Sequence, residues 1–130
     1  MKVGVVGLGL IGGSLCKAYK FSNEEHTVYG YDIDNTVVDF AIMAKVIDGK
    51  LDDEKIKECD LILIAVYPEA AISYLKEKAN LFSKDSVVID CCGTKEKICE
   101  VGFSLAKEYG FTFIGGHPMA GTHNSGFLYS

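Results

Sequence analysis

Two short segments of the sequence carry residue types that can do chemistry. Near the carboxyl end, His117 lies between a glycine pair and Pro118, directly after the apolar run 111–114. These neighbours favour an imidazole presented to a ligand, and a neutral imidazole can accept a proton near pH 7. The alternative is a histidine that bonds only within its own loop. Near the amino end, residues 7–12 read Gly-Leu-Gly-Leu-Ile-Gly, the G-x-G-x-x-G pattern of dinucleotide-binding turns.

Each glycine of this pattern has a separate physical task. Gly7 permits a sharp turn, Gly9 leaves no Cβ between the backbone and a pyrophosphate, and Gly12 lets the next helix pack closely on a strand. Free N–H groups at that helix start then face the phosphates. The alternative is a purely structural turn. The cofactor contacts predicted here are Gly7, Leu8, Gly9, Leu10, Ile11 and Gly12.

An acidic residue follows at the distance that this pattern requires. Asp32 lies twenty residues after Gly12, at the end of a predicted strand over 27–31. A carboxylate there can accept hydrogen bonds from both ribose hydroxyls of NAD and would repel the 2′-phosphate of NADP. The sequence contains no arginine that could bind the 2′-phosphate. We therefore predict NAD as the cofactor, with helix capping as the alternative role of Asp32.

The hydrophobic pattern predicts strands that alternate with helices. Strands are expected at 2–6, 27–31, 61–66, 86–90 and 112–114, with a short stub at 46–48. Helices are expected at 10–19, from Asp34 or Asn35 through 42, from Pro68 onward, and at 95–109. This alternation is typical of α/β proteins with right-handed crossovers and a doubly wound parallel sheet, the Rossmann fold.

In such a sheet, the carboxyl ends of all strands lie at one edge, where ligands bind. The segments that follow the predicted strands therefore converge there. This places further cofactor contacts at Val66, Tyr67, Pro68, Cys92 and Gly93. His117 belongs to the same edge, which favours a proton acceptor beside a bound nicotinamide.

Composition narrows the classes of protein and partner. A chain of 130 residues with 48% apolar residues predicts one domain over 1–130. The net charge of −5 and the scattered lysines argue against nucleic acid as a partner, and no run is long enough to span a membrane. The glycines within 4–13 argue against a secretory signal peptide.

The five cysteines form an odd set without a C-x-x-C pair, so reduced thiols and a cytoplasmic location are expected. Cys91, Cys92, His117 and His123 match no familiar spacing of zinc ligands. We therefore predict no metal site.

Three stretches together resemble the nucleotide-binding domain of prephenate dehydrogenases. They are residues 3–15, residues 90–95, and the Gly-Gly-His-Pro-Met-Ala-Gly motif at 115–121 with Ser125-Gly126. The resemblance implies NAD-dependent oxidative decarboxylation of prephenate to 4-hydroxyphenylpyruvate, in tyrosine biosynthesis. It also implies that His117 hydrogen-bonds the substrate hydroxyl and draws off its proton.

Two positions depart from the family pattern. Gly93 stands where the family often has a substrate-binding serine, and His123 stands where a glutamate is common. Thr94, Lys95 and His123 are the predicted substrate contacts. Arogenate dehydrogenase therefore remains an alternative, as do other Rossmann reductases and a non-catalytic NAD-binding module.

Prephenate carries two carboxylates, and forked recognition of a carboxylate calls for arginine, which this sequence lacks. In the family, that group comes from a following helical domain, which also builds a homodimer. We expect that domain to be absent from these 130 residues. The chain alone should then bind NAD and turn over prephenate poorly.

Overall fold

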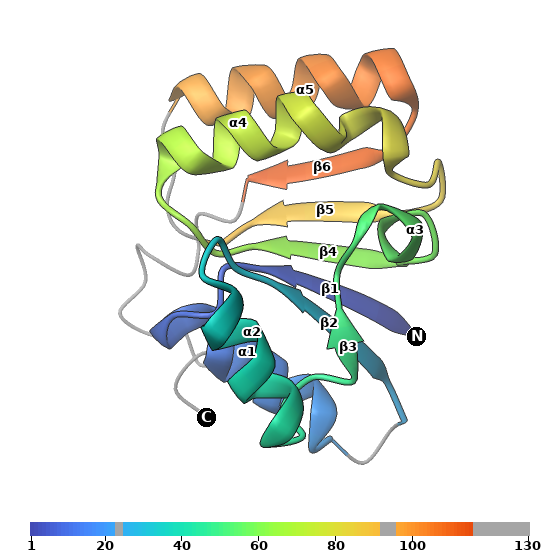
Figure 1. Ribbon diagram of the computed structural model, residues 1–130. Coiled ribbons are helices and arrows are strands. Elements are labelled where there is room, and N and C mark those ends of the chain that lie inside the picture. Colours follow the sequence, from blue (N-terminus) through green and yellow to red (C-terminus); the bar gives the residue numbers. More distant parts are fainter. Residues whose placement is uncertain (23–24, 92–95, 116–130) are drawn as a thin grey trace.

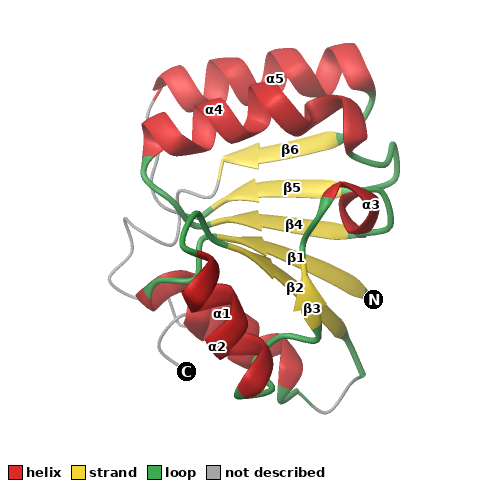
Figure 2. Ribbon diagram, in the orientation of Figure 1, coloured by secondary structure: helices red, strands yellow, loops and turns green. Residues whose placement is uncertain are grey.

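The computed structural model describes residues 1–22, 25–91 and 96–115 (Figure 1). Its strands are β1 (Lys2–Val6), β2 (Thr27–Tyr31), β3 (Gly49–Lys50), β4 (Leu61–Ile64), β5 (Val87–Asp90) and β6 (Thr112–Gly115). Its helices are α1 (Leu10–Lys20), α2 (Asn35–Met43), α3 (Asp53–Ile56), α4 (Pro68–Lys78), the 3-10 turn η1 (Ala79–Leu81) and α5 (Glu96–Tyr109). Figure 2 shows how these helices flank the sheet.

The described strands form one parallel sheet in the order β3-β2-β1-β4-β5-β6. The strand order reverses between β1 and β4, which is where ligands bind in sheets of this kind. In the register, Val6 pairs with Tyr31 on one side and with Ile64 on the other. The doubly wound parallel sheet predicted from the sequence is confirmed.

Two hydrophobic layers cover opposite faces of the sheet because successive strand residues point to opposite sides. Val3 and Val5 belong to the layer packed on α1 and α2. Val6, Ile62 and Ile64 belong to the layer packed on α4 and α5. Nearly continuous apolar strands are expected for a sheet that is buried on both faces.

The helix starts follow their local sequence. Asp34 caps α2 by accepting a hydrogen bond from the N–H of Thr36 at 3.0 Å. Pro68 occupies the first turn of α4, where its missing N–H costs nothing. The start of α1 is different, since Gly9 provides no side-chain cap. The amide groups at this helix start therefore remain available to an external ligand.

The predicted stub strand at 46–48 is wrong. The N–H groups of Val46 and Ile47 both bond back to the carbonyl of Ala41 at the end of α2, so they cannot join the sheet. Lys45, with φ of 61°, turns the chain there. The ladder begins only at Asp48, whose N–H bonds to the carbonyl of Val28, and the strand itself is Gly49–Lys50.

The end of β4 and the presence of α3 also differ from the prediction. β4 ends at Ile64, so the last two residues of the predicted strand 61–66 already belong to the loop at the sheet edge. α3 was not predicted, because a four-residue helix is too short to show a hydrophobic period. In the described ranges, no helix has the length and apolar character needed to cross a membrane.

Candidate dinucleotide site at the carboxyl edge of the sheet

The turn after β1 is possible only with glycine at two positions. Gly7 has φ of +96°, and a Cβ there would lie 2.5 Å from the carbonyl oxygen of Ala65. A Cβ on Gly12 would lie 1.7 Å from the carbonyl oxygen of Gly7. These contacts bring the start of α1 directly against the ends of β1 and β4. The sequence-based roles of Gly7 and Gly12 in the turn are confirmed as packing requirements.

Gly9 is different, since a Cβ there would have no atom of the described residues, other than those of its two chain neighbours, within 4 Å. Its φ of −74° is accessible to any residue. Neither the fold nor the backbone conformation therefore requires glycine at this position. A ligand that lies against the backbone would require it, which is the condition that a pyrophosphate imposes.

The start of α1 is well suited to an anion. The first turn of the helix contains no acidic side chain, and Gly9 precedes the free N–H groups of Leu10, Ile11 and Gly12. The helix dipole adds a partial positive charge at the same place. A diphosphate can therefore be held here by backbone groups alone.

Asp32 links the end of β2 to the glycine turn. Its Oδ2 accepts a hydrogen bond from the N–H of Leu8 at 2.9 Å, and its Oδ1 accepts one from the N–H of Asp34 at 3.0 Å. The carboxylate is therefore held in a fixed position beside the turn. Capping of α2 falls to Asp34, and hydrogen bonds from Thr36 lower the pKa of the Asp34 carboxyl.

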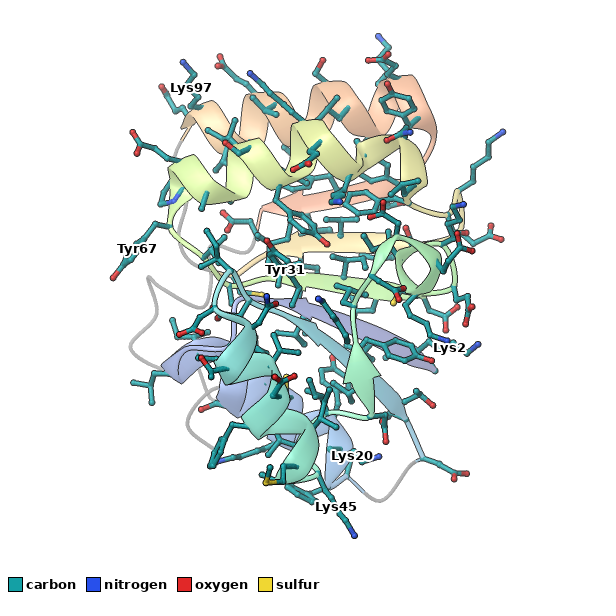
Figure 3. All side chains as sticks on the ribbon, viewed as in Figure 1. Lys2, Lys20, Tyr31, Lys45, Tyr67 and Lys97 are labelled. Carbon is teal, nitrogen blue, oxygen red and sulfur yellow. The ribbon has the colours of Figure 1, made fainter. Side chains whose placement is uncertain are left out.

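The loop after β4 forms the other side of the turn. The side chain of Val66 approaches Gly7, where a Cβ would lie 2.6 Å from Cγ1 of Val66. Tyr67 precedes Pro68 at the start of α4 and is 84% exposed. Figure 3 shows its side chain pointing away from the helix into open space. The structure thus brings Val66, Tyr67 and Pro68 to the same edge as the glycine turn.

One residue at this edge was missed by the sequence analysis. Ile33 directly follows Asp32 and is 90% exposed, and Leu10 at the start of α1 is 89% exposed. At this edge both side chains are available for apolar contact with a ligand. The signal in the sequence was an isolated apolar residue between two acids at a strand end.

The remaining predicted site residues lie outside the described ranges. They are Cys92, Gly93, Thr94, Lys95, His117 and His123. The described residues just before them are adjacent in the sheet, because Asp90 at the end of β5 pairs with Gly115 at the end of β6. The chain therefore enters both predicted segments from neighbouring points of the same edge.

The cysteines of the described ranges form no disulfide; they are Cys16, Cys59, Cys91 and Cys99. Burial raises the pKa of Cys16 and of Cys59 to about 12, so both thiols stay protonated and unreactive. In the same ranges, no group of three or more His, Cys, Asp or Glu side chains could hold a metal ion.

Comparison with known proteins gives a consistent result. Residues 15–130 match the family model of the nucleotide-binding domain of prephenate dehydrogenase. A prephenate dehydrogenase from Lactococcus lactis subsp. cremoris is 36% identical over 129 residues, which cover 98% of this chain and 36% of that protein.

Two solved structures share the fold over nearly the whole chain. Prephenate dehydrogenase from Aquifex aeolicus, solved with hydroxyphenyl propionate and NAD+, is 29% identical with a TM-score of 0.76, covering 95% of this chain and 43% of that one. Arogenate dehydrogenase from Synechocystis is 28% identical with a TM-score of 0.78, covering 95% and 42%. The chain thus spans less than half the length of each of these proteins.

Proposed function

The chain belongs to the prephenate dehydrogenase family as its nucleotide-binding domain, and from this premise we propose that it binds NAD. The observation that carries the proposal is the open space at Gly9 beside a fixed Asp32 carboxylate. The backbone N–H groups at the start of α1 would hold the diphosphate, and the Asp32 carboxylate would accept hydrogen bonds from the hydroxyls of the adenosine ribose. When bound, the nicotinamide ring supplies a hydride acceptor.

We propose prephenate as the substrate of the whole enzyme. In this reaction, the hydride leaves the ring carbon that carries the hydroxyl, and His117 accepts the hydroxyl proton as general base. The carboxylate on the ring then leaves as carbon dioxide, and its bonding electrons make the ring aromatic. The phenolate oxygen takes the proton back, which gives 4-hydroxyphenylpyruvate. The support for His117 is its place in the Gly-Gly-His-Pro-Met-Ala-Gly motif and the position of Gly115 at the end of β6.

The substrate carboxylates need cations that this chain supplies only in part. We propose that Lys95 gives a point charge, and that Thr94 and His123 give polar contacts. A forked carboxylate contact needs a guanidinium, and the 130 residues contain no arginine. We therefore propose that residues beyond these 130 supply it from a helical domain that also forms a homodimer.

Arogenate is the second candidate substrate. The structural similarity to the Synechocystis arogenate dehydrogenase supports it, as does Gly93 in place of the family's serine. A non-catalytic NAD-binding module is the third candidate, and it would not need His117. We further propose a cytoplasmic location, which the lack of disulfides among the described cysteines supports.

An activity assay separates these candidates. NADH formation is measured with prephenate and with arogenate, using the 130-residue chain and the longest natural protein that contains it. The proposal expects turnover of prephenate by the longer protein and little by the chain alone. A preference for arogenate would show that arogenate, not prephenate, is the substrate. Binding of NAD without turnover of either compound would support the non-catalytic NAD-binding module.

A further inference from the structure

A hollow of about 400 Å³ lies beside the candidate dinucleotide site. Tyr31 at the end of β2, Lys50 and Asp52 around the end of β3, and Tyr74 of α4 are among the residues that line it. Its volume lies in the range of small-molecule sites. Nothing in the proposed hydride transfer uses this hollow.

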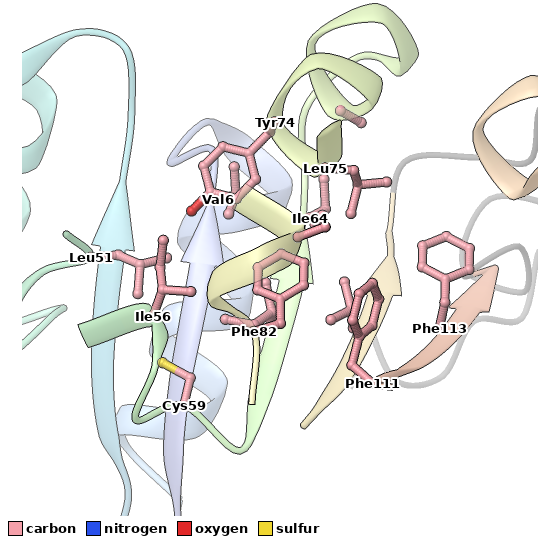
Figure 4. Packing of buried hydrophobic residues seen from close by; sticks show 14 of the residues in the cluster. Val6, Leu51, Ile56, Cys59, Ile64, Tyr74, Leu75, Phe82, Phe111 and Phe113 are labelled. Carbon is pink, nitrogen blue, oxygen red and sulfur yellow. The ribbon is translucent and has the colours of Figure 1, made fainter. Parts of the chain in front are cut away.

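Its position is set by the ends of three strands. Tyr74 packs in one cluster with Val6 and Ile64, the last residues of β1 and β4 (Figure 4). The rings of Tyr74 and Tyr31 lie 5.6 Å apart between centroids. Tyr31 directly precedes Asp32, so one wall of the hollow comes from the residue next to the one that is proposed to hold the adenosine ribose.

The hydroxyl of Tyr74 is an unusual feature of this cluster. Tyr74 is only 7% exposed, and its buried Oη has no hydrogen-bond partner among the residues that the structure describes. Buried hydroxyls are normally paired, because an unmade hydrogen bond is costly. Burial also raises the pKa of this hydroxyl, which keeps it a proton donor. A ligand acceptor placed at this hydroxyl would supply the missing hydrogen bond.

We propose that the adenine of the bound dinucleotide lies in this hollow against the ring of Tyr31 and accepts a hydrogen bond from the Tyr74 hydroxyl. The proposal rests on the proposed NAD site, because the base is bonded to the ribose that Asp32 holds. Adenine offers ring-nitrogen acceptors and one amino donor at its edge. Its faces stack well on aromatic side chains.

The charged rim of the hollow fits the same base. Asp53 is paired with Lys78 at 2.8 Å, and Asp52 caps α3 by accepting the N–H of Lys55 at 2.9 Å. These carboxylates keep lone pairs that can accept a hydrogen bond from the amino group of adenine. Lys50, which also lines the hollow, has a flexible stem and is exposed, so it can move aside as the base enters.

The test is a titration of Tyr74→Phe, which removes only the hydroxyl. NAD and ADP-ribose are titrated by calorimetry, because both carry the base and only NAD carries nicotinamide. We expect the Kd of both ligands to rise by the same factor, about five- to tenfold. The melting temperature of the free variant should stay the same or rise, because an unpaired buried hydroxyl is lost.

A matched control and a second variant keep the test sharp. Tyr109→Phe, on α5, should bind both ligands as the wild type does. Tyr31→Leu removes the aromatic stacking surface and should raise the Kd of ADP-ribose at least fivefold.

Three results would overturn the proposal. Unchanged ADP-ribose affinity in Tyr74→Phe, together with a loss in Asp32→Ala, would keep the NAD site and place the base elsewhere. If Tyr74→Phe loses affinity for NAD but not for ADP-ribose, the hydroxyl contacts the nicotinamide half of NAD and not the adenine. Failure of the wild type to bind either ligand would remove the NAD site and this proposal with it.

Discussion

The carboxylate of Asp32 accepts the backbone N–H of Leu8 at 2.9 Å, which fastens the end of β2 to the glycine turn after β1. The second oxygen accepts the N–H of Asp34. A carboxylate has about four lone-pair sites, so two hydrogen bonds to the protein leave room for two ribose hydroxyls. The same side chain thus fixes the geometry of the turn and presents an acceptor to the sugar.

Replacing Asp32 should weaken the binding of NAD more than the binding of NADP. We expect Asp32→Ala to raise the Kd of NAD by about ten- to a hundredfold, because hydrogen bonds to a charged group are lost. The Kd of NADP should change less, since the repulsion of its 2′-phosphate also disappears. Calorimetric titration of both cofactors measures the ratio. Asp39→Ala, an exposed acid on α2, is the control, and unchanged NAD affinity in Asp32→Ala would remove Asp32 from the site.

Gly9→Ala should separate binding from folding. Apart from its chain neighbours, the added methyl group meets no atom of residues 1–22, 25–91 and 96–115 within 4 Å, and the backbone conformation suits alanine. We expect the melting temperature to stay within about 3 °C of the wild type. NAD affinity should fall at least tenfold, because the methyl group occupies the path of the diphosphate. Normal NAD binding by this variant would show that the diphosphate does not pass over Gly9.

Gly12→Ala should instead damage the fold. Its methyl group would lie 1.7 Å from the carbonyl oxygen of Gly7, so the backbone must move. We expect the melting temperature to fall by roughly 5 to 15 °C. Gly13→Ala is the matched control in the same helix. Its nearest atom would be 3.8 Å away, so alanine there should stabilise α1. Equal melting temperatures for Gly12→Ala and Gly13→Ala would contradict the packing that we describe.

His117→Asn tests the proton acceptor in the longest natural protein that contains this chain. If His117 is the general base, kcat should fall by about a hundred- to ten-thousandfold. NAD affinity should be unchanged, because the cofactor is held by other residues. His26→Asn is the control, since His26 lies next to the amino terminus. Full turnover in His117→Asn would exclude the catalytic role.

The thiols should differ sharply in reactivity. The pKa values of about 12 for Cys16 and Cys59 mean that thiolate is scarce at pH 8. We expect both residues to resist an alkylating reagent in the native protein and to react fully after denaturation. Cys99 is partly exposed and should react first among the described cysteines. Peptide mass spectrometry measures each site, and rapid native labelling of Cys16 would contradict its burial.

The fold and the glycine turn could be predicted because their signals are local. Gly7, Gly12 and Asp32 stand at the spacings of a dinucleotide-binding turn, and the structure has the close packing and the hydrogen bond of such a turn. β3 was misplaced because the end of α2 captures the N–H groups of Val46 and Ile47, a contact that a local pattern does not contain.

The hollow beside Tyr31 could not be found from the sequence. Tyr74 occupies an ordinary apolar position of a helix, and only the folded structure shows that its hydroxyl lacks a partner among the described residues. The roles of His117 and of the segment 92–95 stay predictions. They depend on residues outside the described ranges.

The strand order has a consequence for synthesis on the ribosome. β1 emerges first, yet its neighbour on one side is β4, which is completed only at Ile64. Until then, one edge of β1, which is one of the two central strands, has no native neighbour, and its unpaired backbone N–H and C=O groups can pair with other nascent chains. Bringing β4 to β1 also closes a long stretch of chain, which costs conformational entropy before the contacts between the two strands can stabilise the fold. We expect the first half of the chain to depend on chaperones until β4 has left the exit tunnel.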